Sequence, residues 1–217
     1  MTQYVKEPAN FFAKIRVRCA KPQQIVYIFL KNIEKTLILQ TFPKSSMDKE
    51  LEVRIEANRK EYERLLKDDD YTDVRFNPRN GALSAIHREH NFDPTIGIFG
   101  IPRGNYERIS LDVLYDYGNC VILGSEKLGR NIRAIEGFLN GKPFDMKGIE
   151  GTGKRNIIDK ISDASNKGAE TIVLYFHEER FFERQRIVNA YNGYLKLSKT
   201  NRIQTVYYIV DNKLFKL

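Results

Sequence analysis

Strict alternation of apolar and basic residues marks the first segment with a clear structural signal. In "AKIRVRC", residues 13–19, apolar side chains occupy the odd positions and lysine or arginine the even ones. That period of two predicts a strand with one buried face and one basic, solvent-facing side. The apolar runs "QQIVYIFL" and "TLILQTF" follow, so we expect a small antiparallel sheet over residues 11–42.

The next segment, from Met47 to Lys67, is charged and rich in helix formers, and Ile55, Tyr62 and Leu65 give it a narrow apolar stripe. It predicts a helix, although the alternation in its first turns would also suit a strand. The polar stretch "KDDDYTD" ends this helix and is the expected domain boundary. We therefore divide the chain into a β-rich N-terminal appendage with a helix, residues 1–70, and an α/β domain, residues 71–217.

Residues 71–217 alternate between strand and helix patterns. The stretch "VRFNPRNGALSAIHREHNF" predicts a hairpin that turns near Asn80 and Gly81. From about residue 105 the expected order is helix, three strands, helix, strand, helix and two strands. Such alternation is typical of a sheet covered by helices, so we expect an α/β or α+β fold with a mixed sheet.

Composition favours a globular protein with an anionic partner. Of the 217 residues, 41% are hydrophobic, which is enough for a sizeable core. The net charge of +8 favours nucleic acid as the partner. The sequence has no apolar run of about 18 residues, which argues against a membrane. Two distant cysteines in apolar contexts argue against a disulfide framework, and we expect a cytoplasmic protein with reduced thiols.

The stretch "EGFLNGKPFDMKG", residues 136–148, brings two acids and a lysine close together. Asn140-Gly141 between two alternating runs is the signal for a two-residue type I′ turn. That turn places Glu136 directly opposite Asp145, at a non-hydrogen-bonded position where like charges repel unless something offsets them.

Lys147 projects from the same face as Asp145, two residues further along the strand. Glu136 and Asp145 are therefore candidate ligands of Mg²⁺ or Mn²⁺, and Lys147 a candidate to orient water or to stabilise charge on a phosphoryl group. The alternative is an exposed hairpin in which Lys147 only neutralises Asp145.

Glu136, followed on the next strand by Asp145-Met146-Lys147, resembles the PD-(D/E)xK nuclease motif. The run from Tyr106 to Phe176 is similar to nuclease domains of bacterial polymorphic and contact-dependent inhibition toxins. The resemblance implies a restriction-endonuclease-like α/β/α core and a catalytic glutamate on the preceding helix, where Glu107 stands. It also implies a toxin-like nuclease, with an inhibitor or immunity protein as a partner.

His87 and His90 form a second candidate site, because they are two of only three histidines. With Asp93 they could bind a transition metal, or act as general acid and base in metal-independent RNA cleavage of the barnase or colicin kind. A structural role, in which the imidazoles bond to the neighbouring loop, stays open.

The stretch "GIEGTGKRN" has glycines and a lysine ahead of a predicted helix but lacks the serine or threonine of a nucleotide-binding P-loop. Lys154 and Arg155 are instead expected to contact nucleic-acid phosphates. The leading hypothesis from sequence is a metal-dependent nuclease for DNA or RNA. The alternatives are a histidine-based ribonuclease and a non-catalytic module that binds nucleic acid or protein.

Overall fold

The computed structural model describes residues 46–97, 99–125, 135–153 and 155–217. The sheet expected over residues 11–42 lies outside these ranges. The elements that they contain are α1 (Ser46–Leu65), β1 (Tyr71–Asn77), β2 (Ala82–His87), α2 (Gly104–Asp116), β3 (Cys120–Leu123), β4 (Gly137–Leu139), β5 (Lys142–Ile149), α3 (Asn156–Lys167), β6 (Thr171–Phe176), the 3₁₀ helix η1 (Glu179–Phe181), α4 (Arg184–Leu197), β7 (Thr205–Val210) and β8 (Lys213–Lys216).

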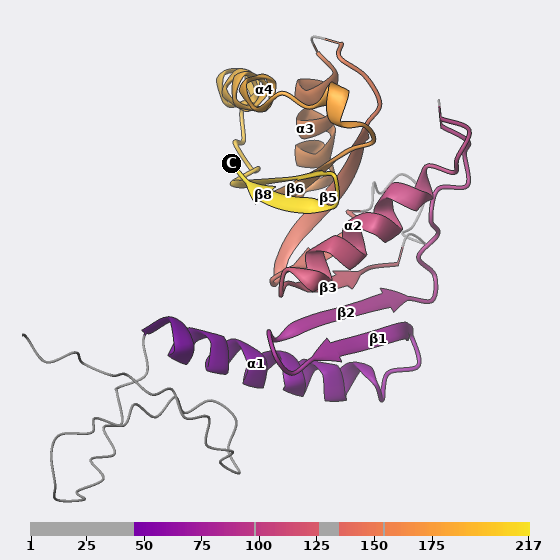
Figure 1. Cartoon of the computed structure of the whole chain (residues 1–217), viewed down its shortest axis with the longest axis vertical. Coiled ribbons are helices and arrows are strands. Elements are labelled where there is room, and N and C mark those ends of the chain that lie inside the picture. The colour runs from indigo at the N-terminus through magenta and orange to yellow at the C-terminus, as the bar shows by residue number, and fades with distance from the viewer. Residues whose placement is uncertain (1–45, 98, 126–134, 154) are drawn as a thin grey trace, which may run out of the picture. The chain divides into compact units, whose positions relative to one another are not determined.

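One mixed sheet contains all the strands in the described ranges, in the same order as along the chain (Figure 1). Strand β2 pairs in parallel with β3, and β5, β6 and β7 are parallel to one another. The antiparallel hairpin of β4 and β5 joins these two groups, so all five strands run in one direction. Their carboxyl ends therefore meet at one edge of the sheet, which we call the carboxyl edge.

Helices cover both faces of the sheet. On one face, Leu111 and Leu114 of α2 belong to a buried cluster with Phe144 and Met146 of β5. On the other face, α3 and α4 pack over β5, β6 and β7, where Ile161 is fully buried. Because successive side chains of a strand point to opposite faces, apolar residues of β5 and β6 pack against the helices on both faces of the sheet.

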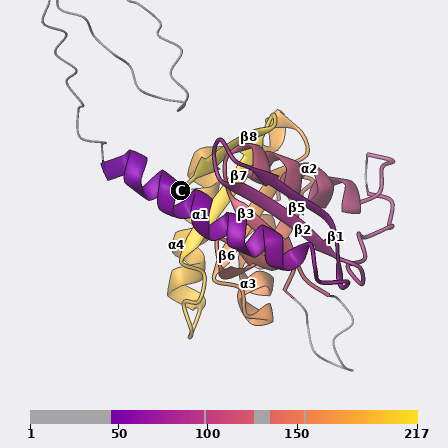
Figure 2. The same cartoon turned by 90° about the horizontal axis from the view of Figure 1, so that it is seen from below.

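Helix α1 packs over the beginning of the sheet, on β2 and β3. Its Leu65 is fully buried against Leu83 and Ala85, and Figure 2 shows the helix running obliquely across the strands. Residues from Asp48 to Leu217 form one compact unit. The structure thus groups α1 with the sheet, whereas the boundary near residue 70 stays a prediction.

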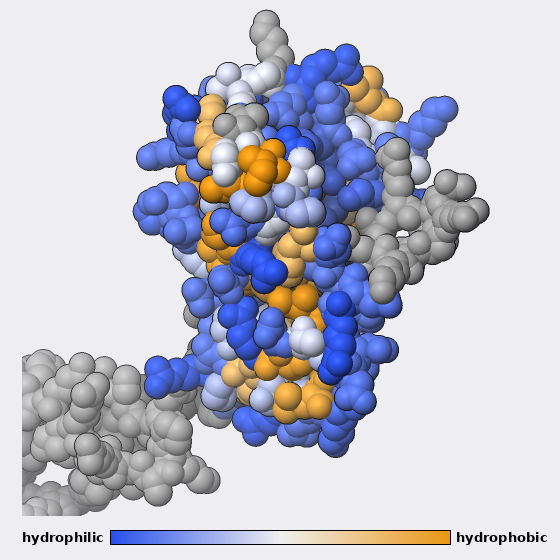
Figure 3. Space-filling model, turned by 90° about the vertical axis from the view of Figure 1, so that its right-hand side faces the viewer, coloured by the Kyte–Doolittle hydropathy of each residue, from blue (hydrophilic) through white to orange (hydrophobic). Residues whose placement is uncertain are grey.

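The element order from residue 105 matches the order expected from sequence, and so do the hairpin near Asn80 and the helix that starts near Met47. The fold is confirmed as mixed α/β at this level. No helix within the described ranges is long and apolar enough to cross a membrane. On the face shown in Figure 3, apolar residues emerge as patches between hydrophilic ones.

The hairpin of β4 and β5 closes at the predicted turn. Asn140 and Gly141 have φ values of 51° and 77°, as a type I′ turn requires. The predicted register holds for three pairs, which end with Gly137 opposite Phe144.

The fourth predicted pair, Glu136 opposite Asp145, is wrong, because the ladder changes there. The amide of Glu136 donates to the carbonyl oxygen of Phe144 at 3.1 Å, so Glu136 and Gly137 both oppose Phe144. An extra residue of this kind is a β-bulge, which redirects the side chain that it carries.

Gly137 is the residue that permits this arrangement. Its φ is 157°, and a Cβ atom there would lie 2.0 Å from the carbonyl oxygen of Ile122 on β3. That neighbour is backbone of a paired strand and has little freedom to move. Only glycine fits between β3 and the bulge.

A Gly137→Ala substitution should lower the free energy of unfolding by about 3 kcal/mol or more, because the new methyl group forces the two strands apart. Gly151→Ala is the matched control, since its Cβ would meet no atom within 4 Å, and should change stability little. Urea unfolding of both variants measures the difference. Equal free energies of unfolding for Gly137→Ala and Gly151→Ala would show that the close approach of Gly137 to β3 does not exclude a side chain.

Candidate metal centre

Several titratable side chains lie at the carboxyl edge of the sheet. His90 follows β2, Glu150 follows β5 and His177 follows β6. Strand β4 runs the opposite way, so Glu136, just before it, reaches the same edge. Ligands of open α/β sheets bind outside the carboxyl ends of the strands, which makes this edge the expected position of a site.

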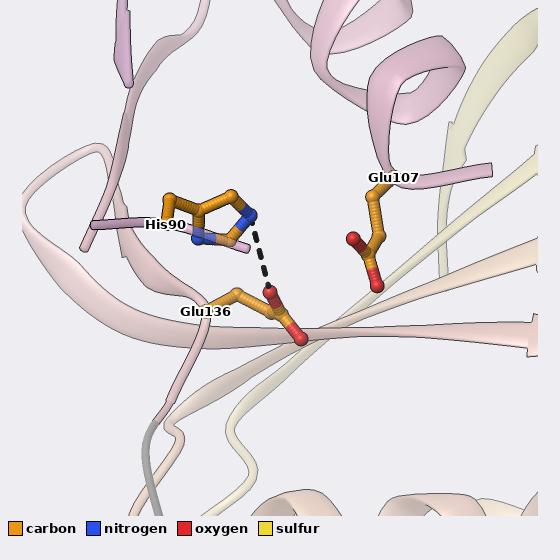
Figure 4. Close-up of side chains that lie close together, drawn as sticks. All are labelled: His90, Glu107 and Glu136. Carbon is orange, nitrogen blue, oxygen red and sulfur yellow. Dashed lines mark ion pairs between the residues drawn. The ribbon is translucent and has the colours of Figure 1, made fainter. Parts of the chain in front are cut away.

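Three side chains from distant parts of the chain converge here: His90, Glu107 and Glu136 (Figure 4). Each offers one ligand atom, and these atoms all lie within 4.8 Å of one another. Glu107 comes from the first turn of α2 and is only 4% exposed, and Glu136 is 8% exposed. We call these three residues the acidic cluster. One imidazole and two carboxylates at this spacing could hold a divalent cation.

The orientation of His90 defines which of its nitrogens faces the carboxylates. Its Nδ1 lies 3.1 Å from the carbonyl oxygen of Gly124, which can only accept, so Nδ1 carries a proton. Burial lowers the pKa of His90, which favours the neutral ring. Nε2 then presents a lone pair toward Oε2 of Glu136, 4.0 Å away, and has no hydrogen-bond partner in the described part of the chain. Two electron-pair donors that face each other at this distance suit a shared cation.

Asp145, the second predicted metal ligand, is not part of the acidic cluster. It is fully buried on the α3 side of β5, where Lys147 lies 2.9 Å and Lys167 3.3 Å from its oxygens. Lys147 also lies 2.9 Å from Asp163 of α3. The bulge explains the separation, because it turns Glu136 toward α2 while Asp145 keeps its regular position in β5.

Tyr106 directly precedes Glu107 on α2, and its phenol is sensitive to the charges of both groups of acids. Burial raises the pKa of its phenol, and the charges of Glu107, Glu136 and Asp145 raise it further. The phenol therefore stays protonated and responds to carboxylates of both groups.

Lys147 keeps its positive charge at this position. Burial opposes the charge, but the carboxylate of Asp145 and hydrogen bonds to Asp145 and Asp163 outweigh burial and raise the pKa of Lys147. The ammonium group can therefore donate hydrogen bonds or stabilise negative charge, but it cannot accept a proton near neutral pH.

A polar pocket of about 460 Å³ opens beside Tyr106 and Lys147. Its charged lining residues are Asp93, Arg103, Lys147, Glu150 and Lys160. The pocket lies between the starts of α2 and α3, at the carboxyl end of β5, and is large enough for a phosphate with its sugar.

The remaining predicted residues lie in other surroundings. The ring of His87 packs against Tyr71, whereas that of His90 packs against Phe92. Arg155 is exposed and lies 3.9 Å from Asp159, and it lines a different pocket between α3 and α4. Lys154 lies outside the described residues.

Sequence reasoning missed His177, Glu150, Arg103 and Lys160. His177 stacks with Phe99, and its Nε2 is 3.9 Å from Glu150, which also contacts Arg103 at 3.4 Å. A usable signal existed for two of them, because Glu150 and His177 each follow directly on an apolar strand. Once β5 and β6 are taken as parallel, such residues are expected at the carboxyl edge.

Comparisons of the chain with protein-family models, curated proteins and solved structures find no match. The chemistry of the site therefore rests on its geometry.

The buried imidazole of His177 predicts a pH dependence of stability. Its side chain is 6% exposed, and burial lowers its pKa despite the nearby charge of Glu150. The unfolded chain then takes up this proton at a higher pH than the folded chain does, so stability should fall as the pH decreases below about 6.5.

Urea unfolding between pH 7.5 and 5, in EDTA, measures this effect. His177→Asn should reduce the slope of unfolding free energy against pH by up to about 1.4 kcal/mol per pH unit. Identical slopes in the two proteins would show that His177 does not contribute.

Proposed function

We propose that the protein is a metal-dependent nuclease, which hydrolyses phosphodiester bonds at the carboxyl edge of its sheet. The observation that carries the proposal is the convergence of His90, Glu107 and Glu136 within 4.8 Å, beside a pocket lined by Lys147. A divalent cation in this cluster would polarise a phosphodiester oxygen and activate a water molecule.

The arrangement of elements supports the resemblance to PD-(D/E)xK nucleases. Helix α2 carries Glu107, and it is followed by three antiparallel strands, α3 and the parallel strand β6. Glu136 precedes the middle strand, and Asp145-Met146-Lys147 lies on the third. Glu107 directly follows Tyr106 on α2, and Lys147 lines the same pocket as Tyr106.

The ligand set favours Mn²⁺ over Mg²⁺. Carboxylate oxygens suit both ions, whereas an imidazole nitrogen is a poor ligand for the harder Mg²⁺. His90 is held by Gly124 with its Nε2 toward the carboxylates, so it adds a nitrogen ligand to the site that sequence reasoning assigned to two acids. The centre we propose consists of His90, Glu107 and Glu136.

In this proposal Asp145 acts by positioning Lys147 rather than by binding the metal. Its carboxylate and that of Asp163 each lie 2.9 Å from Nζ of Lys147. They hold the ammonium group at the pocket and keep it charged. Lys147 would stabilise the negative charge that develops on the phosphoryl oxygens during hydrolysis.

A non-catalytic nucleic-acid-binding module is the second candidate. It is favoured by the ion pairs of Lys147 with Asp145 and Asp163. These two carboxylates already neutralise the ammonium group that catalysis would use. In that case the protein would bind nucleic acid without cutting it.

Titration calorimetry with MnCl₂ and MgCl₂ tests the proposed centre. The parent protein should bind Mn²⁺ more tightly than Mg²⁺, and Glu136→Gln should weaken Mn²⁺ binding at least about tenfold. His90→Ala should remove most of the preference for Mn²⁺. Asp159→Asn, which alters an exposed carboxylate on α3, should bind like the parent. Equal Mn²⁺ affinities in the parent and Glu136→Gln would contradict the assignment.

Cleavage of plasmid DNA and total tRNA tests the activity itself. We expect cutting with Mn²⁺, and none in EDTA or with Glu136→Gln. Cutting that survives EDTA would overturn the proposal in favour of a histidine mechanism. Binding without cutting on either substrate would favour the non-catalytic module.

Lys147→Ala should lower the cleavage rate about 10²- to 10³-fold while Mn²⁺ affinity stays near that of the parent, because Lys147 acts on the substrate rather than on the metal. Lys167→Ala is a matched control, since Lys167 contacts the same Asp145 from α3 but does not line the pocket. Its rate should stay close to that of the parent. A similar loss of cleavage rate in both variants would show that Lys147 only neutralises Asp145.

A further inference from the structure

The polar pocket at the carboxyl end of β5 is lined by cations from three separate parts of the chain. Arg103 immediately precedes α2, Lys147 lies on β5 and Lys160 lies on α3. The lining also contains two acids, Asp93 and Glu150, but these acids do not pair with all three cations.

Two of the cations have close acidic partners. Arg103 lies 3.4 Å from Glu150, and Lys147 lies between Asp145 and Asp163. Lys160 differs, because no ion pair within 4.0 Å involves it among the residues that the structure describes. It is nevertheless half-buried, so water can only partly solvate its charge.

The surroundings of Lys160 are unfavourable for a bare cation. Burial lowers its pKa, and the positive charges of Lys147 and Arg103 lower it further, against a smaller opposite effect of Asp163 and Glu150. An anion bound in the pocket would remove this penalty, since it would lie close to all three cations. Gly148, Gly151 and Asn156 complete the lining, and Asn156 begins α3, where helix geometry also favours negative charge.

We infer that this pocket binds a phosphate of the nucleic-acid strand adjacent to the phosphate that is cut, and that Lys160 is its principal ligand. The inference rests on the proposed function for the identity of the substrate, and it adds a binding residue that the motif does not contain. Tyr106 lines the pocket and directly precedes Glu107 of the acidic cluster, so the pocket and Glu107 both belong to the start of α2.

Binding of fluorescein-labelled single-stranded 12-mers of DNA and RNA, measured by anisotropy in EDTA, tests the inference without metal or cleavage. Lys160→Ala should weaken binding roughly tenfold at low salt. The slope of log affinity against log salt should become shallower by about 0.7, as expected when one phosphate contact to a single strand is lost. Lys160→Arg should retain most of the affinity, and Lys196→Ala, an exposed lysine on α4, should match the parent.

The outcome separates this inference from the proposed function. Calorimetry with MnCl₂ alone reports on the acidic cluster, and Lys160→Ala should bind the ion like the parent. Loss of oligonucleotide binding in Lys160→Ala would support the phosphate site even if the parent bound no metal and cut nothing. Unchanged affinity and salt slope in Lys160→Ala, or no oligonucleotide binding by the parent, would overturn it.

Discussion

The contact between Gly137 and the backbone of β3 is the constraint on which the proposed centre depends. The missing side chain lets β4 approach the carbonyl oxygen of Ile122, and the bulge that follows turns Glu136 out of the regular alternation. In a regular hairpin Glu136 would point to the α3 side with Asp145. The bulge instead directs it to the α2 side, where Glu107 and His90 lie.

The sheet supplies the second requirement, a common edge. Because the chain reverses direction once between β3 and β4 and again between β4 and β5, strands β3 and β5 run in the same direction. Residues separated by almost ninety positions, such as His90 and His177, therefore follow strands that end at the same edge. Parallel strands gather reactive side chains in this way without requiring any two of them to be close in sequence.

Buried charge divides the site into two parts with different chemistry. On the α3 side, Asp145 and Asp163 hold Lys147 as a permanent cation. On the α2 side, the neutral ring of His90 and two carboxylates present electron pairs to one another. A site with electron-pair donors for a metal ion on one side and a fixed ammonium group on the other would suit a phosphodiester, whose hydrolysis needs both.

Local chemistry made much of the fold predictable, whereas the site depended on contacts between distant segments. The Asn140-Gly141 turn and the apolar periodicity depend on neighbouring residues, and they yielded the element order and three pairs of the hairpin register. The bulge at Glu136 depends on a carbonyl group of another strand, so sequence reasoning paired Glu136 with Asp145 instead.

His90 was singled out from its spacing to His87, yet its carboxylate neighbours follow only from the order of the strands in the sheet. The same holds for Lys160, whose surroundings combine β5, α3 and the residue before α2. Nothing in the sequence near Lys160 distinguishes it from the other lysines of the chain.

Diffraction from crystals grown with MnCl₂, with the anomalous signal of manganese located in a difference map, would show whether the acidic cluster holds the ion. We expect a peak within coordination distance of Nε2 of His90 and of carboxylate oxygens of Glu107 and Glu136. A peak between Glu136 and Asp145 with His90 left out, or no peak at the carboxyl edge at saturating Mn²⁺, would contradict this expectation.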